Sequence, residues 1–117
     1  MDIIFREHSE IVYVYTAKES ITDPTENIIE YTLNNPLPIK AVVSDIAPEK
    51  IQWSMPGVAT DRAKSLIIKE KYKGLIKASY KIKYDGEYYE GWRLNGKLQF
   101  RKIGKNYLEV KIYAKKV

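Results

Sequence analysis

The sequence predicts an all-β fold: a small antiparallel β-barrel or sandwich of six to seven strands with two long loops. Three observations support this fold class. Apolar and polar residues alternate with a period of two along much of the chain, which is typical of half-buried strands. Asp85-Gly86 and Asn95-Gly96 are dipeptides that favour two-residue hairpin turns. Ten tyrosines against two phenylalanines also suit half-buried strands better than a deep core.

The first part of the chain contains two predicted strands, residues 11–15 and 37–46, both rich in β-branched side chains. Residues 18–36, between them, are polar and include Asp23-Pro24 and the Asn34-Asn35-Pro36 turn signal. We therefore expect the first long loop at residues 18–36.

The second long loop is expected at residues 48–62, where Pro56-Gly57 is a turn dipeptide. Residues 63–72 are ambiguous, since Thr60 is able to cap a helix and Gly74 to end one. The apolar, β-branched centre of this segment favours a strand instead.

The C-terminal part is the most regular. Residues 76–84 alternate cleanly, with Ile82 in the middle of the apolar set. Hairpin signals separate the following extended runs, which end in a last strand with alternate apolar residues. These patterns predict a four-stranded antiparallel meander formed by residues 76–84, 87–94, 97–103 and 107–116.

The composition of the chain excludes several classes of function. A chain of 117 residues fits one domain, residues 1–117. It has no cysteine and a single histidine, His8, so neither thiolate chemistry nor a histidine-based triad or zinc centre is expected. We expect no enzyme activity, no cofactor and no metal site. With no apolar run long enough for a membrane-spanning helix and no secretory signal, a cytoplasm-like compartment without membrane partners is expected.

Charge is distributed unevenly. Residues 1–60 hold 4 basic and 9 acidic side chains, whereas residues 61–117 hold 16 basic and 6 acidic ones. Such asymmetry is compatible with a nucleic-acid-binding surface, or with copies of one protein that meet through opposite faces. Both interpretations remain open at this point.

Lysine and tyrosine are interleaved in the strand at residues 76–84, as they are in some proteins that bind single-stranded nucleic acid. Because the two residue types alternate, Lys81 and Lys83 should lie on one face and Tyr80 and Tyr84 on the other. A stacking platform needs both types on one face. The pattern therefore favours an amphipathic strand with a solvated lysine face.

The loop at residues 48–62 is unusually apolar. Trp53, Met55 and Val58 are residue types that often anchor protein interfaces. We expect these three to be buried against a neighbouring subunit, although a loop folded over the end of its own barrel is the alternative. Arg62 and Lys64 should lie near that contact and face acidic residues such as Glu26 or Glu30.

The order of these features resembles a known family. Pro-Ile-Lys-Ala-Val-Val at residues 38–43 is followed by Ile46-Ala47-Pro48-Glu49, by Pro56-Gly57-Val58 and by a lysine-rich strand. That strand ends in an I-x-Y-x-G-x-x-Y hairpin from Ile82 to Tyr89. Over most of residues 1–113 the chain is similar to the head-closure (stopper) and related head–tail connector proteins of tailed bacteriophages.

The resemblance implies a small β-barrel that forms a ring of about six or twelve copies below the portal. It implies portal or adaptor proteins and tail proteins as partners, and a virion location after assembly in the host cytoplasm. The loop at 48–62 would then line the lumen or contact a subunit, and the loop at 18–36 would contact a neighbour.

The apolar character of Trp53 and Met55 suits a subunit contact better than a DNA-facing gate, so a contact with packaged DNA in the channel stays open. A tail-terminator or baseplate adaptor would have a similar sequence, and a nucleic-acid-binding β-barrel is the alternative from another functional class.

Overall fold

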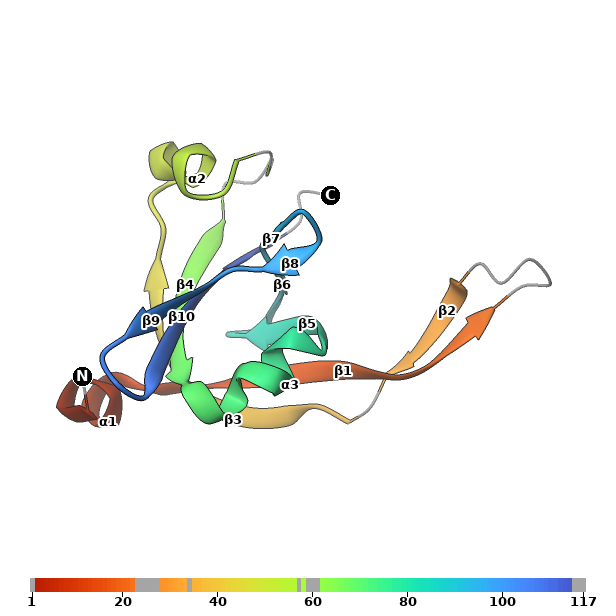
Figure 1. Cartoon of the computed structure of the whole chain (residues 1–117), viewed down its shortest axis with the longest axis horizontal. Helices are drawn as coiled ribbons and strands as arrows, with labels where there is room; N and C mark the ends of the chain where they lie inside the picture. The colour runs from red at the N-terminus through yellow and green to blue at the C-terminus, as the bar shows by residue number, and fades with distance from the viewer. Residues whose placement is uncertain (1, 23–27, 34, 57, 59–61, 115–117) are drawn as a thin grey trace.

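The fold is a closed antiparallel β-barrel of six strands, with further short strands attached outside it and a few short helices (Figure 1). The computed structural model describes residues 2–22, 28–33, 35–56, 58 and 62–114. The barrel order is β1–β3–β4–β10–β6–β5, and β5 pairs again with β1. The bounds of these strands are β1 Glu10–Thr22, β3 Leu37–Asp45, β4 Ala63–Lys69, β5 Ser79–Tyr84, β6 Glu87–Gly91 and β10 Tyr107–Tyr113.

Two strands turn the corners of the barrel. The first half of β3 pairs with β1 and its second half pairs with β4. Similarly, β6 pairs first with β5 and then, through Glu90 and Gly91, with β10. A strand that changes partners along its length lets the sheet curl until its edges meet, which removes exposed edges.

Alternate residues of the barrel strands fill its interior, as the period of two predicts. In β10, Leu108, Val110 and Ile112 are buried, and Ala114 follows just beyond the strand. The core cluster consists of Val12, Val14, Ile39, Ala41, Leu66, Ile68, Ile76, Ile82, Tyr89, Leu98, Leu108, Val110, Ile112 and Ala114.

Both predicted hairpin turns are present. Asp85 and Gly86 have φ angles of 50° and 77°, and Asn95 and Gly96 have 54° and 78°. Positive φ at both central positions is the requirement of a type I′ turn, which explains the choice of these dipeptides. The first turn joins β5 to β6, and the second joins β7 (Arg93–Leu94) to β8 (Lys97–Leu98).

The predicted four-stranded meander is wrong in its pairing. β6 pairs with β10 rather than with the strand that follows it, and β7 and β8 form a separate two-stranded sheet. β9 (Phe100–Ile103) then pairs with β10. The alternation of each strand was recognisable, but the choice of partner depends on barrel closure, which involves residues far apart in the chain.

The loop predicted at residues 18–36 is also wrong over the described residues. β1 continues to Thr22 and pairs with β2 (Ile28–Leu33) in a two-stranded ribbon that extends away from the barrel (Figure 1). The register shifts between Ala17 and Glu19 and again between Ile21 and Thr22. Away from the core no face of a strand has to be apolar, so the alternation that would identify these strands is missing.

The predicted loop at residues 48–62 begins with a helix, α2 (Pro48–Ser54). Proline is well tolerated in the first turn, where its missing N–H has no intrahelical acceptor. Ile51 and Met55 are buried one turn apart, so a helical spacing was hidden in a segment interpreted as a turn. Residues 57 and 59–61 lie outside the described part.

Helical turns also interrupt two predicted strands. The strand expected at residues 63–72 is confirmed as β4 up to Lys69, and a 3-10 helix, η1 (Glu70–Tyr72), follows. The strand expected at residues 76–84 begins only at Ser79, because α3 (Lys73–Lys77) precedes it. Ile76 belongs to α3 and its side chain is buried, so its position in the sequence matched the apolar alternation of the predicted strand. An unanticipated helix, α1 (Asp2–His8), precedes β1.

Gly91 in β6 lies very close to the side chain of Leu98, which leaves no room for a Cβ atom unless Leu98 moves. A Cβ atom on Gly91 would lie 2.4 Å from Cδ2 of Leu98, which is buried. We expect Gly91→Ala to lower the free energy of unfolding by about 1–3 kcal/mol, because Leu98 must leave its rotamer. Urea unfolding of both single variants and the double variant measures this effect. On a Leu98→Ala background the added cost should vanish; additive costs would contradict Leu98 as the obstacle.

Candidate interaction surfaces

Trp53 is the most exposed large apolar side chain among the described residues. It lies on α2 and is 87% exposed, while Ile51 on the same helix is buried. The helix thus packs one side on the barrel and leaves the indole in solvent. An indole so exposed adds little to the stability of its own chain, and it is free to contact a partner, as the interface prediction requires.

Met55 and Val58 do not fit the same prediction. Met55 is 0% exposed and forms a small core with Ile51 and Ala63. Val58 is partly buried against this core, together with Ile46, Trp92 and Tyr113. The expectation that Met55 is buried by a neighbouring subunit is therefore corrected, because Met55 is already buried within its own chain, where it packs α2 on the barrel. Val58 is partly buried at the same place, and Trp53 is left in solvent.

Arg62 and Lys64 are paired within their own chain. The Arg62 guanidinium forms an ion pair with Glu87, and the Lys64 ammonium forms one with Asp45. Glu26, one of their two predicted acidic partners, lies outside the described residues, and the side chain of Glu30 on β2 is not described. Largely exposed ion pairs of this kind contribute about 0–1 kcal/mol to stability. They therefore orient side chains at this end of the barrel and add little to its stability.

The same end of the barrel contains two tyrosines that donate to carboxylates. Tyr84 donates to Oε2 of Glu10 at 2.8 Å, which together with partial burial raises the pKa of Tyr84 to about 12. Burial, followed by a 3.0 Å hydrogen bond to Glu87, raises the pKa of Tyr89 to about 12. Both phenols stay protonated near neutral pH. They therefore keep their hydrogen bonds to Glu10 and Glu87 and are poor general bases.

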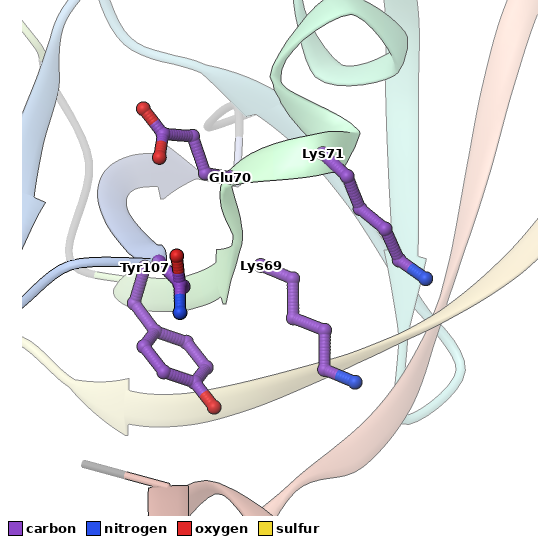
Figure 2. Close-up of a pocket in the computed structure, with 5 residues that line it drawn as sticks. Lys69, Glu70, Lys71 and Tyr107 are labelled. Atoms are coloured by element: carbon purple, nitrogen blue, oxygen red, sulfur yellow. The ribbon is translucent and has the colours of Figure 1, made fainter.

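An open cavity of about 520 Å³ lies near α1 and is lined by residues 69–71, Asn106 and Tyr107 (Figure 2). Lys69 and Lys71 extend to the same side, whereas Glu70 points the other way. Glu70 pairs with Lys102 at 3.1 Å. With Glu70 paired to Lys102, the lining presents mainly the two lysines and is a basic surface.

Tyrosines and lysines from three strands meet on the outside of the barrel, opposite the core-facing residues. In the β1–β5 pairing Tyr13 lies beside Lys83 and Tyr15 beside Lys81, and in the β5–β6 pairing Lys83 lies beside Tyr88. We call Tyr13, Tyr15, Lys81, Lys83 and Tyr88 the tyrosine–lysine face.

Contacts on this face are short. The Lys81 ammonium lies 4.3 Å from the ring centroid of Tyr88 and 5.1 Å from that of Tyr15. The two rings meet edge to face at 6.0 Å, and the Lys83 ammonium lies 5.5 Å from the Tyr88 centroid. Burial, and then the hydrogen bond with Tyr88, raises the pKa of Tyr15. The face is therefore a preorganised cationic and aromatic surface.

The sequence argument against an aromatic platform is overturned here. It is correct that Lys81 and Lys83 lie on the face of β5 opposite Ile82, which is buried. The aromatic rings come instead from β1 and β6. Alternation within one strand cannot reveal such a neighbour; only the register between strands could have identified it.

Among the residues that the structure describes, no three histidine, aspartate or glutamate side chains are grouped so that they could hold a metal ion. No helix in the described ranges is long and apolar enough to span a bilayer. Comparison of the sequence with known protein families and with curated proteins found no match in either set.

Proposed function

We propose that this chain is a structural protein of a tailed-bacteriophage virion that forms a ring at the head–tail connector, through contacts made by its protruding segments. The observation that carries the proposal is the β1–β2 ribbon. Among the described strands β2 pairs with β1 alone, and the ribbon extends away from the barrel (Figure 1).

Among the described strands, this two-stranded ribbon has no third strand beside it. An isolated two-stranded hairpin is at best marginally stable in water, and three or more strands or a packing partner are needed for independent stability. The molecule measures 51 × 30 × 26 Å along its principal axes, so its shape is elongated. A neighbouring subunit that covers the ribbon would supply the missing contacts.

The exposed Trp53 gives independent support. It lies on α2, a different element from the ribbon, and large exposed aromatic side chains are enriched at the centres of protein interfaces. Two protruding features on different elements suit a heterologous contact, in which one surface meets a different surface of the next copy. Repetition of such a contact closes into a ring when the rotation permits.

The purified chain tests this proposal. Native mass spectrometry and electron microscopy should show a closed ring of about six or twelve copies, alone or when the portal complex is added. Labelled antibodies should mark the neck of intact virions. A label at the tail end would favour a tail-terminator or baseplate adaptor, and a chain that stays monomeric in every mixture would refute ring assembly.

A nucleic-acid-binding barrel is the second candidate, and the tyrosine–lysine face is the observation that favours it. Aromatic rings beside cations on a small barrel suit single-stranded nucleic acid. Titration of a labelled oligonucleotide at several salt concentrations distinguishes the two. Submicromolar binding with a steep salt dependence would favour the nucleic-acid function, and weak, length-independent binding would favour assembly.

A further inference from the structure

We propose that the tyrosine–lysine face of one copy binds the β1–β2 ribbon of the next copy. This inference rests on the proposed ring assembly and names the two surfaces that meet. Within the described part of the chain, the side-chain contacts of Lys81 and Lys83 are with aromatic rings, and neither lysine forms an ion pair with a carboxylate. Tyr13 and Tyr88 are 43% and 48% exposed.

The ribbon has the complementary composition. Residues 17–33 contain four acidic side chains and one basic one, a net charge of −3. They also include three isoleucines, a tyrosine and a leucine, which suit packing on tyrosine rings. A carboxylate can accept hydrogen bonds from both an ammonium and a phenol, and the face offers both kinds of donor.

The ribbon of the same chain extends away from its own face. In β1 residues 13–16 pair with β5, and the ribbon begins immediately afterwards at Ala17. From there the ribbon continues outward from the barrel (Figure 1). The acidic segment of another copy is therefore the occupant that fits, and the contact is heterologous.

Other basic groups are less suitable partners for the acidic ribbon. Arg62 and Lys64, the partners predicted from the sequence, already pair with Glu87 and Asp45. Lys81, by contrast, is positioned between two rings before any partner arrives, so less side-chain entropy is lost on binding. Preorganisation and charge thus favour the same face.

The test uses two charge-reversed proteins. The face variant carries Lys81→Glu and Lys83→Glu, and the ribbon variant carries Glu19→Lys, Glu26→Lys and Glu30→Lys. Each alone should self-associate about 100-fold more weakly than the wild type, since attraction becomes repulsion. Mixed in equal amounts, they should assemble again, because each offers the other a complementary pair of surfaces. Analytical ultracentrifugation measures all three samples.

A matched control has the same charge change elsewhere. Lys97 on β8 and Lys105 in the β9–β10 turn are exposed and lie outside the face, so Lys97→Glu with Lys105→Glu should assemble like the wild type. If the face variant does not fold, Lys81→Gln with Lys83→Gln replaces it, with a smaller loss of association expected.

The outcomes are distinguishable. If the wild type forms rings and the face variant does too, this inference is overturned while ring assembly stands. If the face variant assembles normally but loses binding to a labelled single-stranded oligonucleotide, the face is a nucleic-acid site instead. If the wild type never assembles, the proposed function fails, and this inference fails with it.

Discussion

Replacing Trp53 by alanine should abolish ring assembly and leave the folded subunit almost unchanged. The side chain is 87% exposed, so its removal takes little from the barrel, and the free energy of unfolding should change by less than about 0.5 kcal/mol. An interface anchor of this type contributes at least about 2 kcal/mol to its contact, or about thirtyfold in Kd. Native mass spectrometry and thermal unfolding measure the two effects.

Met55 is the matched control in the same segment. It is 0% exposed in the cluster beneath α2, so Met55→Ala should lower the free energy of unfolding by about 2–5 kcal/mol. Opposite results from two large apolar residues two positions apart would separate the interface from the core. A large loss of stability in Trp53→Ala, with assembly intact, would contradict the assignment of Trp53.

Removing the β1–β2 ribbon should have an equally large effect on assembly. Ala17 and Leu33 are cross-strand partners, so replacing residues 18–32 by Asn-Gly joins them through a two-residue turn. The last pairing of β1 inside the barrel, between Thr16 and Ser79, remains intact. Rings should be lost, while the barrel should be as stable as before or slightly more so, because the closed loop is shorter.

Urea unfolding and electron microscopy together check this expectation. A deletion variant that still forms rings would exclude the ribbon from the subunit contact. If the barrel itself unfolds, the ribbon contributes to the core and does not serve as a separate arm. A useful comparison is the ribbon variant with reversed charges, which keeps the full length of the ribbon and changes only its electrostatics.

The elements that sequence reasoning predicted correctly depend on neighbours in the chain. The Asp85-Gly86 and Asn95-Gly96 turns require positive φ, which glycine and asparagine adopt readily. The inward face of β10 follows from the alternation of Leu108, Val110 and Ile112. Each of these signals is complete within a few residues.

The errors occurred where that local information was incomplete. The ribbon extends away from the barrel, and its sequence lacks the apolar alternation by which a strand is recognised. α2 hides a helical spacing of two buried residues, Ile51 and Met55, in a segment with strong turn signals. Because burial decides which periodicity is meaningful, and burial is set by the whole barrel, neither element was identifiable from its own residues.

The sequence alone determined the all-β class, the hairpin turns and most of the residues that face the core, since local backbone preferences and alternation specify these features. Only the tertiary structure decided that β6 pairs with β10, that Met55 is internal while Trp53 is exposed, and that Lys81 lies between Tyr15 and Tyr88. These three facts depend on the closure of the barrel. Closure brings together side chains that are far apart in the chain, such as Tyr15 and Tyr88, which are separated by 73 positions. No short-range pattern encodes such a meeting.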